Sequence, residues 1–281
     1  RQRDRLFLYD ENTVLGYLGY AQGRDENCRN CYFNIFLDPQ YNGNGYRQLL
    51  YERMLEEIQT FACNRLYADI YEHPNYDHFK KSLLNNNFYI GLKIRESSLQ
   101  LENINLIEYN PLLKKLDAKG IQFYDAKNEM LNFSDHYKKL EELQWKYGKD
   151  FPMPKGIAHT RNPFEQYMKY QKLFEEKHYG IEVVAVDGDM YVGSTDIHLF
   201  PKSDPFKAWT GSLGVLREYR RRGIATALKI KAFEITAGIF ISFNCILLIC
   251  LGVIFVLTGI KKGVSAMPFL VCNFPILAFP S

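Results

Sequence analysis

Short runs rich in β-forming apolar and aromatic residues recur along the first half of the chain. Residues 5–9 and 14–20 are two such runs on either side of the turn residues 10–12, and together they predict a β-hairpin. Residues 31–37 predict a third strand. The pattern then predicts a loop, a helix, a strand, a second helix and a further strand, over residues 40–45, 46–62, 65–71, 74–86 and 88–101.

The second half of the chain repeats this order of elements. After a connector, residues 102–119, which contains Pro111, the pattern predicts a strand, two helices, a hairpin, another strand and a last helix. These elements cover residues 121–124, 134–147, the segment that starts at Asn162-Pro163, residues 182–186 with 190–200, residues 209–216 and residues 223–234. A repeat of so large a unit indicates a duplicated domain rather than a solenoid of short repeats.

The last part of the chain has a different character, because Lys261 and Lys262 are the only charged residues after Glu234. Residues 237–260 are long and apolar enough to span a bilayer, with the two lysines as a cytoplasmic anchor. A membrane anchor is one interpretation of this tail. A reading-frame change or gene truncation is the other, and it is favoured because the composition changes inside the last predicted helix.

Composition and charge narrow the possible functions. Hydrophobic residues make up 47% of the 281 positions and charged residues 24%, which is typical of a folded soluble protein. The net charge of +3 is too small to indicate a nucleic-acid partner. The six cysteines are scattered, and Cys28-x-x-Cys31 has no second pair at ligand spacing. We therefore expect reduced thiols, no metal site and a cytoplasmic location.

A turn between an apolar strand and an amphipathic helix carries the clearest chemistry. Residues 220–225 read Arg-Arg-Arg-Gly-Ile-Ala. In a strand–turn–helix of this kind the first helical N–H groups and the helix dipole face the turn, which suits an anion. Gly223 and Ala225 have almost no side chain, so a pyrophosphate could approach the backbone closely. An ordinary turn with solvated arginines explains so short a motif equally well.

The wider segment from Gly214 to Leu228 closely resembles the acetyl-CoA-binding segment of the GNAT superfamily, with Arg220, Gly223 and Ala225 at the key positions. Gln40-Tyr-Asn-Gly43-Asn44-Gly45 fits the same pattern, again after a strand and before a helix. The resemblance covers roughly residues 5–234 and implies an α/β fold (a mixed sheet with helices) that contains two GNAT-like domains in tandem. An apolar tail follows them.

The resemblance implies domain boundaries at the ends of the two repeats. The first GNAT-like domain lacks its opening elements, and the second lacks its closing elements. The expected divisions are a first domain, a connector, a second domain and the tail, at residues 1–105, 106–119, 120–235 and 236–281.

The resemblance also implies a function, the transfer of an acetyl group from acetyl-CoA to a small-molecule amine or an amino-terminal acceptor. Acetyl-CoA would be held in the second domain by Leu213, Gly214, Val215, Arg220, Arg221, Arg222, Gly223, Ile224, Ala225 and Thr226. The equivalent residues of the first domain would be Gln40, Gly43, Asn44 and Gly45. The strand before the turn would pair with the pantetheine arm and offer an N–H group to the oxyanion.

The catalytic acid and base are less clear from the sequence. Where the family often places a tyrosine after the fifth strand, the first domain has Leu83. Glu72 and Tyr76 are nearby candidates, although solvated surface groups explain them too. Asp196 and His198 share one face of a strand in the second domain and could order a water that accepts a proton, or they could simply lie on an exposed face.

Two other functions remain open at this stage. The missing tyrosine and the missing half domain favour a non-catalytic acyl-CoA-binding module. The apolar tail favours a membrane-tethered protein with a degenerate GNAT domain, in which residues 237–260 are the membrane contact.

Overall fold

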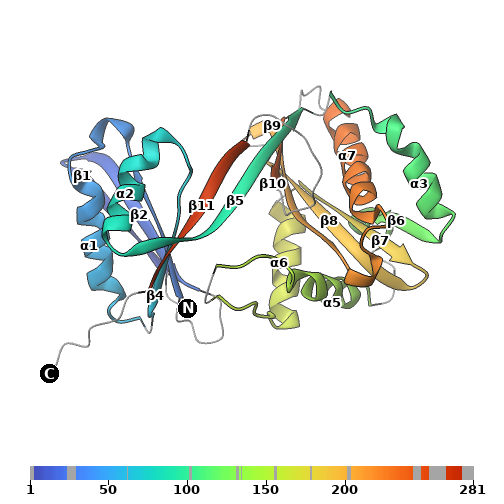
Figure 1. Ribbon diagram of the computed structural model, residues 1–281, viewed down its shortest axis with the longest axis horizontal. Coiled ribbons are helices and arrows are strands. Elements are labelled where there is room, and N and C mark those ends of the chain that lie inside the picture. The colour runs from blue at the N-terminus through green and yellow to red at the C-terminus, as the bar shows by residue number, and fades with distance from the viewer. Residues whose placement is uncertain are drawn as a thin grey trace. The chain divides into compact units, whose positions relative to one another are not determined.

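The computed structural model divides the chain into two compact units (Figure 1). The first unit contains Arg1–Arg95, Pro152–Thr160 and Ser265–Ser281, and the second contains Glu96–Phe151 and Arg161–Val264. The structure describes residues 3–23, 30–61, 63–100, 103–130, 133, 135–154, 157–177, 179–200, 204–242, 248–252 and 264–273. In each unit the strands form a mixed sheet that carries helices, which is the α/β fold that the sequence predicted.

The strands of the first unit follow the order β1–β2–β3–β4–β11. Neighbouring strands are antiparallel except for β3 and β4, which are parallel. The elements are β1 (Arg3–Asp10), β2 (Thr13–Gln22), β3 (Asn30–Leu37), α1 (Tyr46–Ile58), β4 (Arg65–Asp69), α2 (Asp77–Asn85) and β11 (Val264–Asn273). Leu50 and Met54 of α1 and Leu83 of α2 are buried against the sheet, so this unit has its own core.

The strands of the second unit follow the order β10–β9–β8–β7–β6, and the last residues of β5 (Phe88–Gln100) pair with β10. Here β9 and β10 are the parallel pair. The strands are β6 (Ile121–Asp125), β7 (Tyr179–Asp187), β8 (Met190–Phe200), β9 (Asp204–Val215) and β10 (Leu248–Gly252). The helices are α3 (Asn110–Asp117), α4 (Ala126–Glu129), α5 (His136–Gly148), α6 (Phe164–Lys177) and α7 (Ile224–Ser242).

Helices cover both faces of the second sheet (Figure 1). On β8, Ser194 contacts Tyr147 of α5, whereas the neighbouring Gly193 lies against Leu228 of α7. Successive strand residues point to opposite faces, so α5 and α7 lie on opposite sides of the sheet. The face toward α5 also carries α6 and, as shown below, the candidate site.

The β1–β2 hairpin of the first unit and the β7–β8 hairpin of the second repeat each other residue by residue. Each hairpin has a two-residue turn, and the pair Gly16↔Leu37 between β2 and β3 corresponds to the pair Gly193↔Val215 between β8 and β9. Even the register shift near the turn recurs, between Leu8 and Tyr9 in one unit and between Ala185 and Val186 in the other. The internal repeat that the sequence predicted therefore extends to the register of these two hairpins.

Three segments differ from the pattern read in the sequence. The expected connector contains a short 3-10 helix and α3, because Pro111 occupies the first turn of a helix, where it is tolerated. Helix α7 extends to Ser242, beyond the predicted end at Glu234. Of the apolar residues 237–260, the structure places 237–242 in α7 and 248–252 in β10, and the others lie outside the described residues. Within the part of the chain that is described, no helix combines the length and apolar character needed to cross a membrane.

A glycine in β9 allows α5 to pack closely on the second sheet. A Cβ atom on Gly214 would lie 2.0 Å from the ring of Tyr147, so only glycine permits this ring to pack flat on β9. Tyr147 is 2% exposed and belongs to the core of the unit. Its ring therefore fixes the distance between α5 and the end of β9.

We expect Gly214→Ala to lower the free energy of unfolding of the full chain by about 1–3 kcal/mol, because the added methyl group overpacks this contact. Urea unfolding followed by fluorescence measures the effect. Gly148→Ala at the end of α5 is the matched control, because a Cβ atom there meets nothing within 4 Å. Equal stabilities of the two variants would contradict this account of the contact.

Candidate active site

The end of β9 has one edge that is not paired with another described strand. β10 pairs with Lys207–Thr210 of β9, and β9 then continues to Val215. The N–H group of Leu216 donates to the carbonyl of Val192 on the β8 side, at 2.9 Å. Because backbone groups alternate between the two edges of a strand, the N–H groups of Val215 and Leu213 point to the other side. We call residues 212–215 of β9 the open edge.

The turn that follows the open edge forms an anion-binding geometry. Gly223 has φ +90° and Arg221 has φ +64°, so the backbone doubles back before α7 begins at Ile224. The carbonyl of Gly223 accepts the N–H of Ala227 at 3.0 Å. The preceding N–H groups of the first helical turn have no helical acceptor and face the turn with the positive end of the helix dipole. This arrangement suits a phosphate or pyrophosphate.

The three arginines of the turn have different surroundings. Arg220 donates from Nε to the carbonyl of Val215 at 2.9 Å and forms an ion pair with Asp150, so it braces the turn against the open edge. The pKa of Asp150 lies well below its usual range because Arg217 and Arg220 donate to it. Arg222 donates to the backbone of its own turn and lies over a tyrosine ring. Arg221 is exposed and has no ion pair among the described residues, which leaves its charge available to a ligand.

A cavity of about 450 Å³ opens beside the open edge, on the face of the sheet that α5 and α6 cover. Most of its lining is polar or aromatic. The lining residues are Gln144, Tyr167, Tyr170, Gln171, Leu173, Glu182, Asp196, His198 and Ser212. Because Ser212 belongs to both the cavity and the open edge, a molecule in the cavity would lie next to one bound along β9.

Asp196 and His198 form a hydrogen-bonded pair in this cavity. His198 Nε2 lies 2.6 Å from Asp196 Oδ2. The other carboxylate oxygen, Oδ1, accepts both the N–H and the hydroxyl of Ser212. With Nε2 donating to the carboxylate, a neutral imidazole has its lone pair on Nδ1, which is the arrangement of a general base oriented by an acid.

Tyr147 connects this pair to the core. Its hydroxyl lies 3.0 Å from Ser194 Oγ and 3.4 Å from Ser212 Oγ. Burial raises the pKa of Tyr147 well above its usual range, so the phenol stays neutral and keeps its hydrogen. A continuous set of contacts therefore runs from Tyr147 through Ser212 to Asp196 and His198.

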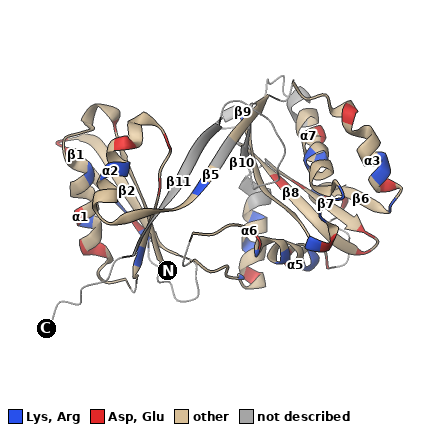
Figure 2. Ribbon diagram, viewed as in Figure 1, with Lys and Arg blue, Asp and Glu red and all other residues tan. Residues whose placement is uncertain are grey.

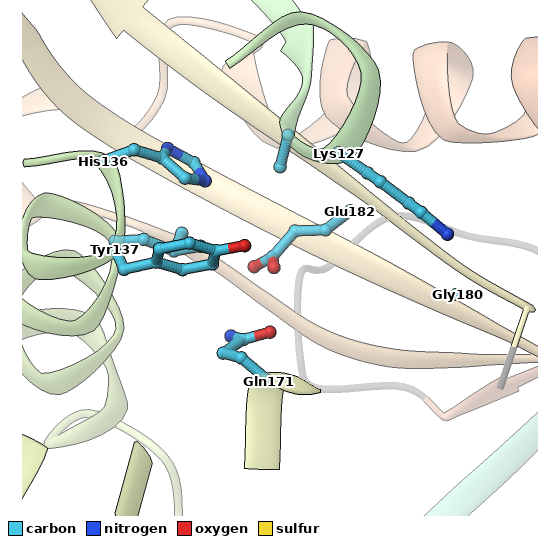
Figure 3. Close-up of a pocket in the computed structure, with 8 residues that line it drawn as sticks. Lys127, His136, Tyr137, Gln171, Gly180 and Glu182 are labelled. Atoms are coloured by element: carbon cyan, nitrogen blue, oxygen red, sulfur yellow. The ribbon is translucent and has the colours of Figure 1, made fainter. Parts of the chain in front are cut away.

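Glu182 brings a second carboxylate to the same face. Many of the charged residues lie on the helices (Figure 2), whereas Glu182 is one of the few buried charged residues and lies within a strand. Glu182 is only 7% exposed and accepts the Nε2–H of Gln144 at 2.6 Å. It also lines a small adjoining cavity, in which its carboxylate and the hydroxyl of Tyr137 point toward one another while the amine of Lys127 points away (Figure 3).

Comparison with known proteins identifies the fold that carries this site. The model of the acetyltransferase (GNAT) family matches residues 1–78 and 140–241, which is more than half of the chain. The chain belongs to the GNAT acetyltransferase family. Members of this family generally use acetyl-CoA or another acyl-CoA.

Solved structures agree with this at the level of the fold. A tandem GNAT protein from the clavulanic acid biosynthesis pathway matches 100% of this chain and 84% of its own, at 14% identity and a TM-score of 0.67. A GCN5-related N-acetyltransferase from Sphaerobacter thermophilus matches 93% of this chain and 77% of its own, at 15% identity and a TM-score of 0.60. A GCN5-related glucosamine N-acetyltransferase region of a fungal GH3 beta-N-acetylglucosaminidase matches 92% of this chain and 32% of its own, at 11% identity and a TM-score of 0.67. A comparison with curated proteins gave no match. The tandem GNAT fold predicted from the sequence is confirmed.

The first GNAT unit has the same turn backbone as the second. Gly45 has φ +78°, and its carbonyl accepts the N–H of Leu49 at 3.1 Å. Gly223 has φ +90° and accepts the N–H of Ala227 in the same way. In each unit a three-residue 3-10 helix comes before the turn. Gly45 is therefore the structural counterpart of Gly223.

This alignment differs by two residues from the one that the sequence motif suggested. The motif paired Gly43 with Gly223 and Gly45 with Ala225. With Gly45 aligned to Gly223 instead, the residue that corresponds to the small Ala225 is Arg47. The glycines of the two turns are spaced differently, so the motif alone could not give this alignment.

The side chain of Arg47 lies across the open edge of the first unit. It donates to the carbonyl of Ile35 at 3.5 Å and to Asn42 Oδ1 at 2.7 Å, and its guanidinium lies over the ring of Phe79 at 5.3 Å. β3 and β4 pair only as far as Phe33, so Ile35 lies on the edge that corresponds to that of β9. Burial lowers the pKa of Arg47, as expected for a guanidinium held away from water.

The first unit also lacks the polar groups of the cavity. The identical strand register shows which of its residues take the places of Glu182, Asp196 and His198, and these are Arg5, Gly19 and Ala21. Two neutral small residues and a cation thus replace the acid–base pair and the second carboxylate. In the second unit the structure brings Asp196 and His198 together in a cavity that shares Ser212 with the open edge.

The two catalytic candidates from the first unit have surface environments. Glu72 forms ion pairs with Lys80 at 3.5 Å and Lys93 at 3.4 Å, and these lower its pKa. A carboxyl with a lowered pKa is a weak general base. Tyr76 packs its ring against Tyr71, at a centroid distance of 5.9 Å. The roles of Glu72 and Tyr76 in catalysis stay predictions.

The sequence interpretation missed Asp69, the last residue of β4. The pairing of β3 and β4 ends at Ala68, so Asp69 lies where the edge opens. Its Oδ1 atom is buried without a hydrogen-bond partner in the described structure, and burial raises its pKa to about 6. An aspartate inside a predicted apolar strand, residues 65–71, was the only signal in the sequence.

The interpretation also missed Tyr147 and Glu182. Tyr147 lies on the apolar side of a predicted helix, and Glu182 begins a predicted apolar strand, so both had the pattern of structural residues. Of the paired cysteines, Cys28 lies outside the described residues. Cys31 is buried beside the buried Cys63, and a hydrogen bond between the two thiols raises the pKa of Cys31 strongly.

We expect Gly223→Val to abolish CoA binding to the second unit, because the left-handed backbone and Leu112, 2.7 Å from a Cβ atom at this position, leave no room for a side chain. Ala225→Arg places an arginine where the first unit has Arg47, without straining the backbone. It should weaken CoA binding tenfold or more, which is roughly the effect of losing the contacts between the pyrophosphate and the turn. Arg221→Ala removes one exposed charge and should weaken binding no more than about fivefold.

Calorimetry with CoA measures these affinities, and circular dichroism shows whether each variant is folded. Unchanged CoA affinity in folded Ala225→Arg would mean that CoA does not use this turn.

We expect the stability of the first unit to fall as the pH rises from about 4 to about 6, through the titration of Asp69. Its pKa is raised from 3.8 to about 6 in the folded chain, so the unfolded chain loses this proton first and is favoured as pH rises. Urea unfolding at a series of pH values, compared with Asp69→Asn, isolates the effect. The difference between the free energies of unfolding of the two proteins should change between about pH 4 and pH 6 and be constant above about pH 7. A difference that is constant over the whole pH range would contradict the raised pKa of Asp69.

Proposed function

We propose that this chain transfers an acetyl group from acetyl-CoA to an amine, and that the second unit carries out the chemistry. The observation that supports this most directly is the Asp196–His198 pair in a cavity that shares Ser212 with the open edge of β9. A proton acceptor, an acceptor cavity and a site for an acyl-CoA thus occur side by side in one unit. One of the structural neighbours is a GCN5-related glucosamine N-acetyltransferase region, and glucosamine is also an amine.

The residues of the second unit fit acetyl-CoA as a substrate. The N–H groups of the first turn of α7, with Arg221 beside them, would hold the pyrophosphate. Along β9 the N–H groups of Leu213 and Val215 point to the open edge, where they can pair with the pantetheine amides and donate to the thioester oxygen. Arg220 would fix this edge through the carbonyl of Val215 rather than contact the phosphates.

In the transfer that we propose, His198 removes a proton from the substrate. An amine enters mainly as an ammonium ion, and Nδ1 of His198 takes its proton while Asp196 holds the Nε2–H. The amine nitrogen then attacks the thioester carbon, so a C–N bond forms and the C–S bond breaks. The second proton of the nitrogen passes to the leaving sulfur, which gives the acetylated amine, CoA and one released proton.

We propose a different role for the first unit. Arg47 occupies its open edge, and Arg5, Gly19 and Ala21 supply no proton acceptor. The sequence motif at Gln40, Gly43, Asn44 and Gly45 then marks a GNAT turn that binds CoA weakly, if Arg47 is displaced, and transfers no acetyl group. Its buried thiols are compatible with a reducing, cytoplasmic location.

We expect His198→Gln to lower kcat/KM for acetyl transfer by about 10²–10⁴, the usual effect of removing a general base. CoA affinity should stay unchanged, because His198 lies in the acceptor cavity rather than at the turn. Release of CoA, followed with a thiol reagent in the presence of an amine panel, measures the rate. His78→Gln, an exposed histidine of the first unit, is the matched control and should keep full activity.

Two outcomes would decide against the proposal. Activity of His198→Gln within a factor of a few of the wild type would exclude this histidine as the base. CoA binding by the wild-type chain without turnover of any amine would favour the non-catalytic acyl-CoA-binding module instead.

A further inference from the structure

Helix α7 carries a buried amine that has no role in the transfer as described so far. Lys229 Nζ is buried and has no hydrogen-bond partner in the described structure. Burial lowers the pKa of Lys229 to about 8, and the negative charge of Asp196 acts in the opposite direction. The neighbouring Lys231 and Glu234 of the same helix pair with each other. An unpartnered ammonium group is costly to bury, so its position calls for a functional reason.

Lys229 lies on the face of α7 that continues from the pyrophosphate turn. Ala225, Lys229, Ala232 and Thr236 follow one another at intervals of four, three and four residues, so they share one face of the helix. Ala232 and Thr236 are fully buried. Lys229 is about 6 Å of helix rise beyond Ala225. Its amine therefore lies inside the unit, one helical turn below the anion-binding geometry.

A second buried polar group marks the point where β9 and β10 part. Thr210 is the last residue of β9 that pairs with β10. It is 5% exposed, and its Oγ1 atom has no hydrogen-bond partner in the part of the chain that the structure describes. The open edge begins two residues later, at Ser212. Thr210 thus lies at the inner end of the open edge, away from the turn.

The first unit shows that these two positions adjoin each other. Counted from the glycine of the turn, the residue that corresponds to Lys229 is Tyr51. Phe33 corresponds to Thr210, because each is the last residue of its strand that pairs with the parallel neighbour. The ring centroids of Tyr51 and Phe33 are 5.7 Å apart. By this correspondence the side chain of Lys229 is directed at Thr210, the inner end of the open edge.

The thioester of a bound acyl-CoA would lie at the same end. With the pyrophosphate at the turn, the pantetheine arm runs along the open edge toward Ser212, which also lines the acceptor cavity. The acceptor enters from the face that α5 covers, whereas α7 lies on the opposite face. A proton donor on α7 can therefore reach the sulfur without occupying the space of the acceptor.

We propose that Lys229 is the acid that protonates the leaving sulfur. As the C–N bond forms and the C–S bond breaks, the ammonium group of Lys229 gives one proton to the sulfur, and CoA leaves as the thiol. The second proton of the amine nitrogen then restores the ammonium group through solvent, so the net transfer from nitrogen to sulfur is unchanged. This inference rests on the proposed acetyl transfer and adds a second catalytic residue to it.

The pKa of the CoA thiol in the complex tests this position without any turnover, and the ultraviolet absorbance of the thiolate measures it. The thiol of CoA bound to the intact chain should have a pKa about 1 below that of free CoA, because a nearby ammonium group stabilises the thiolate. Lys229→Met removes the charge, keeps a side chain of similar length and should abolish this difference. Lys231→Met, which removes the lysine that pairs with Glu234, is the control. Circular dichroism and CoA affinity show whether each variant is folded.

The rate of CoA release with the best amine of the panel is the second measurement. Lys229→Met should lower kcat roughly tenfold or more and leave KM for acetyl-CoA unchanged, whereas Lys231→Met should keep both values. An acid must carry its proton to act, so kcat of the wild type should fall above about pH 8. This fall should be absent from Lys229→Met.

The outcomes separate this proposal from the acetyl transfer itself. A bound thiol whose pKa is not below that of free CoA would overturn the role of Lys229, even if the variant does not fold, and would leave the transfer by His198 intact. Wild-type kcat in folded Lys229→Met would overturn it in the same way. A lowered thiol pKa in a chain that acetylates no amine would support the position of Lys229 and overturn the transfer.

Discussion

Parallel strands that are paired over only part of their length create the constraint on which both units depend. Where β10 stops at Thr210 of β9, and β4 stops at Phe33 of β3, the backbone groups of the longer strand need other partners. The second unit meets this need with Arg220 at one carbonyl, and leaves the N–H groups of Leu213 and Val215 directed at the edge. The first unit meets it with Arg47.

The comparison of the two units separates what the fold requires from what the chemistry requires. Both keep the register of one hairpin (β1–β2 and β7–β8), a glycine with positive φ before the helix, and a buried helix face. Among the described residues, only the second has Glu182, Asp196 and His198 at the corresponding strand positions and the small Ala225 after the turn. Because the shared features are those of folding, they give no information on activity, and the differing side chains do.

The elements of the fold were predictable because each has a strong local pattern. The alternation in residues 14–20 gives β2, and the glycine turn before Ile224 gives α7. Two features of the site were also visible: the arginine-rich turn, and the spacing of Asp196 and His198 on one face. The alignment of the two turns was not predictable from the motif, since it depends on which glycine has the left-handed conformation next to the helix.

Other parts of the site depend on contacts between distant segments. Tyr147 is 47 positions from Ser194, and Glu182 is 38 positions from Gln144, so no local pattern could join them. Likewise, Arg47 is an ordinary residue of an amphipathic helix until the strand edge beside it is known. The position of Glu182 opposite Asp196 could be known only from the pairing of β7 with β8.

The contact between Gly214 and Tyr147 has a further consequence for the orientation of the site. The same tyrosine that packs on this glycine also contacts Ser194 and Ser212, and Ser212 donates to Asp196. A displacement of α5 would therefore move a hydroxyl group that contacts the partner of Asp196. The packing of α5 on the sheet and the orientation of the Asp196–His198 pair are thus linked through one aromatic ring.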